Sequence, residues 1–93
     1  MGRSNRIRPA RLGEKLFIIR DLLGLTQEQL ISRLNYTASP LYPQNVSGFE
    51  TGEREPNLLI LLAYARLAGI CLDILVDDAQ ELPKKLPSTL HQK

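Results

Sequence analysis

The chain has 93 residues and a formal net charge of +2, with 43% hydrophobic and 24% charged residues. This length favours a single domain, and the balance of apolar and charged residues is typical of a globular protein, not a disordered one. The small net charge does not by itself indicate a nucleic-acid-binding protein. The longest apolar run, residues 58–63, is far too short to span a bilayer, so we expect no membrane segment.

The cysteine content and the N-terminal sequence favour a cytoplasmic location. Cys71 is the only cysteine, so no internal disulfide can form. The arginine-rich start is not followed by the long apolar stretch and cleavage site that a secretion signal requires. We therefore expect the chain to work in the reducing cytoplasm.

Residues 1–9 are expected to form a flexible basic arm. The basic residues of the first fifteen positions are Arg3, Arg6, Arg8, Arg11 and Lys15. They are accompanied by a single acid, Glu14. A basic start attracts a phosphate backbone, so Arg6, Arg8 and Arg11 are candidate phosphate contacts. The alternative is a solubilising tail, since disordered arms are common at chain ends.

A first helix is expected from about Ala10 to Leu23. Its apolar residues recur at helical spacing and are Leu12, Leu16, Ile19 and Leu23. Gly24 ends the helix because glycine readily adopts a left-handed conformation. Phe17 and Ile18 lie opposite the stripe, so this helix has more apolar surface than one buried face requires.

A second helix is expected from its N-cap, Thr26, to about Leu34. Gln29 follows the cap by three residues, which is the spacing of a capping box. Residues 35–42 then predict a loop, because their prolines and small polar residues do not continue a helix.

A third helix is expected to begin at Pro43, which suits a first turn, and to end at Gly52. Val46 and Phe49 are its apolar pair. Ser47 lies between them in the chain, and we expect it where the third helix approaches the second.

A fourth helix is expected from Leu58 to Ala68, with Asn57 as its N-cap. Its core face is assigned to Leu58, Leu61, Leu62, Ala65 and either Leu67 or Ala68. A short fifth helix follows over residues 72–76, and residues 79–93 predict a tail that contains prolines.

Apolar residues outside the assigned core predict an interface. They are Phe17, Ile18, Leu59, Ile60 and Ala63. Excess apolar surface of this kind marks contact with another molecule, and here a homodimer is the first expectation. The alternative is that the tail folds back and covers this surface with Leu82, Leu86 and Leu90.

The segments LGLTQEQL (residues 23–30) and VSGFETGEREP (residues 46–56) resemble the phage-repressor/Cro-type (XRE-like) helix-turn-helix family. They match its pattern of glycine, hydrophobic, Ser/Thr and Gln, followed later by hydrophobic, Ser, hydrophobic, Glu, Gly, Arg and Pro. The resemblance extends over about residues 12–76. It implies an all-α, compact, five-helix, lambda-repressor-like domain over residues 10–78. It also implies binding of double-stranded DNA by a homodimeric transcriptional regulator that acts as a repressor.

The resemblance further implies roles for individual residues. Gln27, at the start of the second helix, and Arg54, after the third, would contact phosphates. Gln44 and Asn45 would read base edges, because a side-chain amide pairs with adenine N6 and N7. The alternative is that Gln44 and Asn45 are exposed capping residues.

A partly buried ion pair between Arg20 and Glu50 is also implied, joining the first helix to the third. The alternative is two solvated charges, which would contribute little to stability. If the pair is buried, removal of one partner is costly because the other charge is left unpaired.

The chain departs from the family's pattern at two places. Between Leu34 and Val46 it has roughly five residues more than the short turn of the motif. Gly48 stands where the family has a longer polar side chain, so we expect fewer base contacts.

No enzyme chemistry, metal or cofactor is expected. His91 is the only histidine and lies near the end of the chain, and Cys71 has no histidine nearby. No pair of carboxylates, metal-binding cluster or glycine-rich phosphate loop has the required spacing. The family includes antitoxins, so a toxin or the transcription machinery is a further candidate partner. The alternative function is a protein–protein adaptor that keeps the fold without binding DNA.

Overall fold

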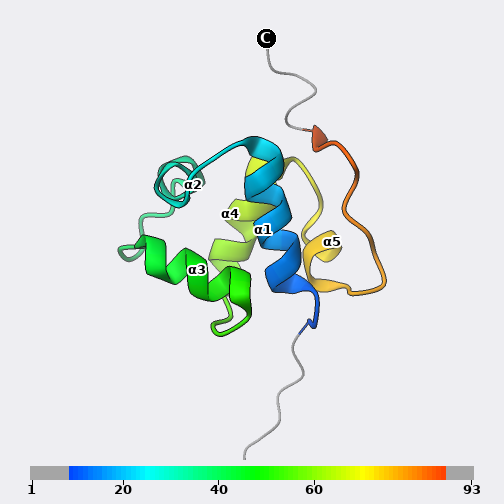
Figure 1. The fold of residues 1–93 in the computed structure, drawn as a ribbon, viewed down its shortest axis with the longest axis horizontal. Helices are drawn as coiled ribbons and strands as arrows, with labels where there is room; N and C mark the ends of the chain where they lie inside the picture. The colour runs from blue at the N-terminus through cyan, green and yellow to red at the C-terminus, as the bar shows by residue number, and fades with distance from the viewer. Residues whose placement is uncertain (1–8, 88–93) are drawn as a thin grey trace, which may run out of the picture.

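The computed structural model describes residues 9–87, which form five helices and no strands (Figure 1). The helices are α1 (Leu12–Leu23), α2 (Gln27–Leu34), α3 (Pro43–Thr51), α4 (Leu58–Ala68) and α5 (Leu72–Val76). α1 and α4 lie at the centre, with α2 and α3 on one side and α5 on the other. The expected all-α, five-helix domain is therefore confirmed. Among the described residues, no helix has the length and apolar content needed to cross a bilayer.

The helix ends follow local signals in the sequence. Thr26 Oγ1 accepts a hydrogen bond from Gln29 N at 3.1 Å, and Gln29 Oε1 accepts one from Thr26 N at 2.9 Å. The capping box of α2 is therefore complete. Asn57 Oδ1 caps α4 by accepting a hydrogen bond from Ile60 N at 2.8 Å. Gly24 ends α1 with a φ of 69°, which glycine adopts at low steric cost.

All five helices contribute to one hydrophobic core. Its members on α1, α2, α3 and α5 are Leu12, Leu16, Ile19, Leu30, Leu34, Val46, Phe49 and Leu75. The apolar stripe predicted for the first helix is therefore buried, apart from Leu23, which is half-buried at the edge of the core.

The buried face of α4 differs from the expected one. Its buried residues are Ile60, Leu61, Tyr64, Ala65 and Ala68. Ile60 is 4% exposed and belongs to the core, so its assignment to an interface is wrong. Leu58, assigned to the core, is 67% exposed. The reason is that α4 is apolar on nearly every side, so its sequence does not define which face turns inward. Its contacts with α1, α2 and α5 decide the rotation.

The segment that follows α5 packs against the domain. Leu86 is 1% exposed and Leu82 packs against the core. Arg11 Nη1 and Nη2 donate hydrogen bonds to the two carboxylate oxygens of Glu81, each at 3.0 Å. The carboxylate of Asp78 accepts bonds from the backbone N–H groups of Ala10 and Arg11 at 2.7 and 3.0 Å. These bonds lower the pKa of Asp78, and they join the start of α1 to the C-terminal segment.

Lys15 is buried in the contact between α1 and α5, with 1% exposure. Its Nζ donates hydrogen bonds to the carbonyl oxygens of Ile74 and Asp77 at 2.6 and 2.9 Å. Lys15 thus satisfies carbonyl groups at the C-terminal end of α5, where a positive charge is favourable. Its place in the basic N-terminal stretch had indicated a surface charge, whereas the structure buries it.

The backbones of α1 and α3 approach each other closely at Gly13. A Cβ atom at this position would lie 2.8 Å from the carbonyl oxygen of Glu50 and 2.9 Å from that of Phe49. Both atoms belong to the backbone of α3 and cannot move without displacing that helix. The absence of a side chain at Gly13 therefore allows the two helices to pack.

We expect Gly13→Ala to destabilise the domain, although alanine is the better helix former by about 1 kcal/mol. The added methyl group must push α3 away, and overpacking of this kind costs about 1–3 kcal/mol. Urea denaturation followed by circular dichroism measures the change in the free energy of unfolding. Ser32→Ala, at an exposed position of α2, is the control and should be neutral or slightly stabilising. Equal or greater stability of Gly13→Ala would contradict the close approach.

Candidate nucleic-acid interface

α2 and α3 pack against each other on one side of the domain and are joined by residues 35–42 (Figure 1). Val46 and Phe49 turn inward from α3 and are buried in the core. The opposite face of α3 is open to solvent. Two short packed helices with one free face are the framework of helix-turn-helix DNA recognition.

The free face of α3 carries small polar residues. Gln44, Ser47 and Thr51 are all exposed. Ser47 therefore does not lie in the contact with α2, where the sequence analysis had placed it. Gln44 and Ser47 are three residues apart and share one side of the helix. Their spacing was the signal that could have identified Ser47 as a candidate contact.

Asn45 acts as a capping residue at the start of α3. Its Oδ1 accepts a hydrogen bond from the backbone N–H of Tyr42 at 2.8 Å. A bidentate contact with adenine uses this same oxygen as the acceptor for N6. Capping thus competes with base reading at Asn45. Gln44 is exposed and has no hydrogen bond to another described residue, so it is the better candidate for reading bases.

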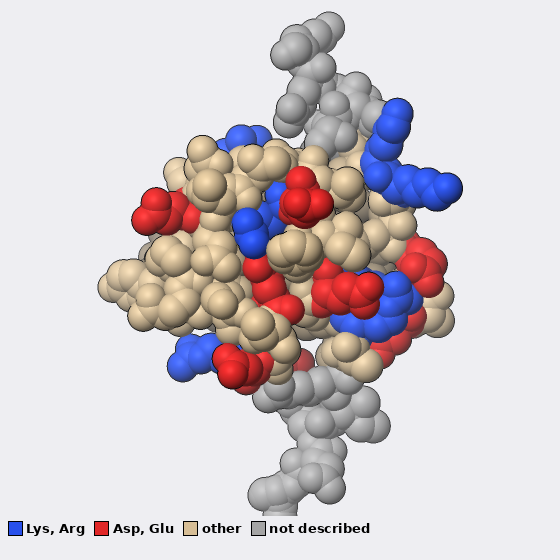
Figure 2. All heavy atoms as spheres, in the orientation of Figure 1, with Lys and Arg blue, Asp and Glu red and all other residues tan. Residues whose placement is uncertain are grey.

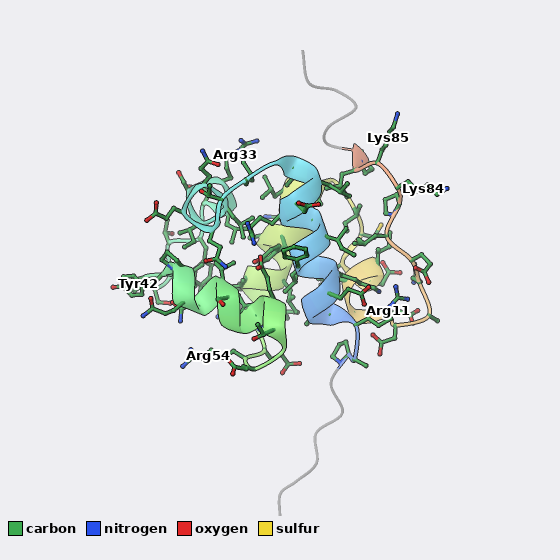
Figure 3. All side chains as sticks on the ribbon, viewed as in Figure 1. Arg11, Arg33, Tyr42, Arg54, Lys84 and Lys85 are labelled. Carbon is green, nitrogen blue, oxygen red and sulfur yellow. The ribbon has the colours of Figure 1, made fainter. Side chains whose placement is uncertain are left out.

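Tyr42 is a candidate contact that the sequence analysis missed. It precedes the first residue of α3 and is 54% exposed. Figure 3 shows its side chain at the outer end of α3, directed away from the body of the domain. An exposed aromatic ring beside Gln44 adds contact area at the end of the helix that would enter a groove.

Gly48 provides the space in which the side chain of Arg54 lies. The backbone N–H of Arg54 donates a hydrogen bond to the carbonyl oxygen of Gly48 at 3.1 Å. A Cβ atom on Gly48 would lie 3.0 Å from Cδ and 3.2 Å from Cγ of Arg54. The Arg54 side chain is therefore held against α3, while the residue as a whole stays exposed (Figure 3). Its guanidinium forms no ion pair with another described residue.

Gln27 is the first residue of α2 and is half-buried. The first-turn N–H groups of a helix attract anions. Glu28 follows directly in the first turn and reduces this attraction. Gln27 therefore lies at a helix N-terminus whose positive field is weak.

The Arg20–Glu50 ion pair implied by the family resemblance is present. Arg20 Nε donates to Glu50 Oε2 at 2.6 Å, and Nη2 donates to Oε1 at 3.0 Å. Nη1 donates to the carbonyl oxygen of Leu25 at 3.0 Å. The two side chains are only 18% and 8% exposed. The pair raises the pKa of Arg20 and joins α1, the turn after it and α3.

The basic N-terminal stretch does not supply Arg11 to this interface. Figure 3 places Arg11 beside α5, whereas Tyr42 and Arg54 lie at α3 on the other side of the domain. The guanidinium of Arg11 is paired with Glu81, and its contact with a phosphate stays a prediction. Arg6 and Arg8, the other predicted arm contacts, lie outside the described residues.

Charges of both signs are interspersed on the face of the domain shown in Figure 2. Most of the surface over α3 on this face is uncharged, and no large basic area covers it. Electrostatic attraction to a phosphate backbone is therefore modest over this face of the domain.

The residues predicted for a homodimer interface do not gather on one surface. Leu59 and Ala63 line a groove with residues at the end of α2 and in the loop after it. Ile18 lines a different hollow, together with Leu82 of the C-terminal segment. The alternative, in which the tail covers the apolar surface, therefore applies to Ile18, because Leu82 of the tail lies beside it. It does not apply to Leu59, which is 59% exposed. Leu90 lies outside the described residues.

No model of a known protein family matches the chain, and no curated protein matches it. A functional conclusion therefore depends on the residues and geometry of the domain itself.

We expect Arg20→Met and Glu50→Gln each to destabilise the domain by about 1–3 kcal/mol, somewhat less than the ~3–5 kcal/mol of a fully buried pair. Each change leaves the other group with an unmatched charge or hydrogen bond. The double variant should lose less than the sum of the single losses, and a double-mutant cycle in urea unfolding measures this coupling.

The exposed pair Arg11–Glu81 is the matched control for this cycle. It is also bidentate, yet Arg11→Met with Glu81→Gln should show a much smaller coupling than Arg20 and Glu50, because solvent screens the charges. Strictly additive losses for Arg20 and Glu50 would show that their contact does not stabilise the fold.

Proposed function

We propose that the chain is a sequence-specific DNA-binding protein of the phage-repressor/Cro (XRE-like) type that regulates transcription as a repressor. The observation that carries this proposal is the free polar face of α3, which the Arg20–Glu50 pair and the core hold in a fixed position beside α2. An occupied operator blocks transcription without any further activity of the protein, so a rigid reading helix is sufficient for repression.

In the proposed complex α3 enters the major groove, and Gln44 reads base edges with Ser47 beside it. Gln27 at the start of α2 and Arg54 after α3 contact phosphates on either side. Phosphate contacts fix the orientation of a reading helix, and base contacts provide the sequence preference. Because Gly48 contributes no side chain and Asn45 is engaged in capping, Gln44 has the main reading role.

A homodimer belongs to the proposal because a single short helix reads too few base pairs for useful specificity. Ile60 is buried and Ile18 is only partly exposed, so neither is suited to the contact. Phe17 and Leu22 on α1 are 46% and 41% exposed, and they are the apolar residues that we propose for it.

A protein–protein adaptor remains the second candidate function. It is favoured by the mostly uncharged surface over α3 and by the internal use of Arg11 and Lys15. An adaptor of this fold would bind random duplex DNA weakly or not at all. The salt dependence of DNA binding separates the two functions.

We expect the chain to bind duplex DNA with an affinity that falls steeply with salt, by about 0.9 logarithmic units per phosphate contact for each tenfold rise in concentration. Selection from a random duplex pool should yield a preferred site. Gln44→Ala should lower the preference for that site by about 1–3 kcal/mol, whereas Gln27→Ala should weaken all sequences alike.

The matched control is Gln80→Ala, which alters a glutamine beside α5 and should leave DNA binding unchanged. If the selection yields no preferred site and any binding is insensitive to salt, the adaptor function replaces DNA binding. If Gln44→Ala leaves the preference intact, α3 is not the reading helix.

We expect Arg54→Ala to reduce the slope of log affinity against log salt by about one unit, as loss of one phosphate contact does. Gly48→Ala should have part of the same effect, because its methyl group displaces the Arg54 side chain from α3. Gly48→Ala in the Arg54→Ala background should cause no further loss. Urea unfolding checks that stability is retained. Two independent, additive losses would show that Gly48 does not act through Arg54.

A further inference from the structure

A groove of about 540 Å³ lies between α4 and the end of α2. One wall is formed by residues 33–38, and the other by residues of α4. The lining residues on α4 are Leu59, Leu62, Ala63, Arg66 and Leu67. No residue of α3 lines the groove, so it is separate from the proposed DNA-reading face.

The insertion that precedes α3 builds one wall of this groove. Residues 35–38 belong to the roughly five residues by which the chain exceeds the short turn of the motif. The hydroxyl oxygen of Tyr36 accepts a hydrogen bond from Asn57 Nδ2 at 3.0 Å, and its ring packs against the core. Asn57 is also the N-cap of α4. The inserted residues are therefore held against α4 and do not extend freely toward α3.

The groove combines an apolar floor with positive charge. Leu59 is 59% exposed, and Leu62 and Ala63 are half-buried along the same helix. Arg33 and Arg66 line the groove, both are exposed, and no carboxylate lines it. Neither arginine forms an ion pair with another described residue. The complementary ligand therefore presents apolar side chains flanked by carboxylates.

The terminal segments of this chain do not have that chemistry. Residues 1–8 contain three arginines and no acid, and residues 88–93 contain a lysine and no acid. The carboxylates of Asp73 and Asp77 on and after α5 are bonded to Gln80 on the opposite side of the domain. A contact between α5 of one copy and the groove of another would be head-to-tail and would not close a symmetric dimer.

A nucleic acid also fits the groove less well than a protein does. Its phosphates would match Arg33 and Arg66, but it would leave the exposed leucine floor without apolar partners. Burial of apolar surface is favourable, at about 25 cal/mol per Å². An apolar side chain of a partner protein on Leu59 gains this contribution, whereas a sugar-phosphate backbone does not.

We propose that the groove between α2, the inserted loop and α4 binds an acidic amphipathic helix of a partner protein. The apolar face of that helix lies on Leu59, Leu62 and Ala63, and its carboxylates pair with Arg33 and Arg66. Because α3 does not line the groove, partner and DNA can be bound together. The inserted loop is thus a partner-binding element that goes beyond the DNA-binding function.

The test uses two labelled synthetic peptides of about 16 residues, long enough to form a helix. Both have leucine at i, i+3, i+4 and i+7, and the flanking positions carry glutamate in one peptide and lysine in the other. Fluorescence anisotropy with the full chain measures binding. We expect the glutamate peptide to bind about tenfold more tightly at low salt, since it forms two exposed ion pairs that the lysine peptide cannot form.

Variants of the groove make the test specific. Arg33→Glu with Arg66→Glu should reverse the preference between the two peptides, and Leu59→Ser should weaken both. The matched control is Lys84→Glu with Lys85→Glu, which makes the same change of charge on the C-terminal segment, away from Arg33 in Figure 3. It should leave the preference unchanged. Gln44→Ala should not alter peptide binding, so failure of the groove and failure of DNA binding are distinguishable.

Four results would overturn the proposal. Equal affinity for the two peptides, or an unchanged preference in the charge-reversed variant, would show that the arginines do not select acidic ligands. Loss of duplex DNA binding in that variant would make the groove a nucleic-acid site. A fall in solution mass from dimer to monomer in Leu59→Ser would identify a second copy as the occupant. Urea unfolding of each variant confirms that it is folded.

Discussion

The position of α3 depends on the ion pair between Arg20 and Glu50. One guanidinium bonds both carboxylate oxygens of Glu50 and the carbonyl oxygen of Leu25, so it holds α1, the turn after α1 and α3 together. Glu50 is 8% exposed, and an unpaired carboxylate there would be costly. Gly13 lets the two helix backbones meet beside this pair. A short helix with only Val46 and Phe49 as buried anchors gains a fixed orientation in this way.

Some arginines and lysines of this domain form bonds within it, whereas others are exposed and can contact another molecule. Arg11, Lys15 and Arg20 are bonded to carboxylates or carbonyl groups of the domain itself. Arg33, Arg54 and Arg66 are exposed. A net charge of +2 therefore does not describe how positive charge is distributed for binding. In the proposed functions Arg54 serves the DNA face, and Arg33 and Arg66 serve the groove on α4.

The loop between α2 and α3 connects these two surfaces. At one end Tyr36 is bonded to Asn57 and forms part of the wall of the groove. At the other end the backbone of Tyr42 is bonded to the side chain of Asn45, which caps α3. A partner in the groove would contact the same segment that begins the reading helix. This arrangement offers a direct physical route by which partner binding could alter DNA affinity.

The sequence by itself determined the five helices, because caps and stop signals act within about four residues of each helix end. Thr26 with Gln29, Asn57 and Gly24 are examples. Resemblance to a family located Arg20 and Glu50. Tertiary structure alone decided which side of the apolar helix α4 is buried. It also decided that Arg11 and Lys15 are bonded to groups of the domain itself, since their partners lie 70 and 59 positions away in the chain. Such distant partners leave no local pattern in a single sequence.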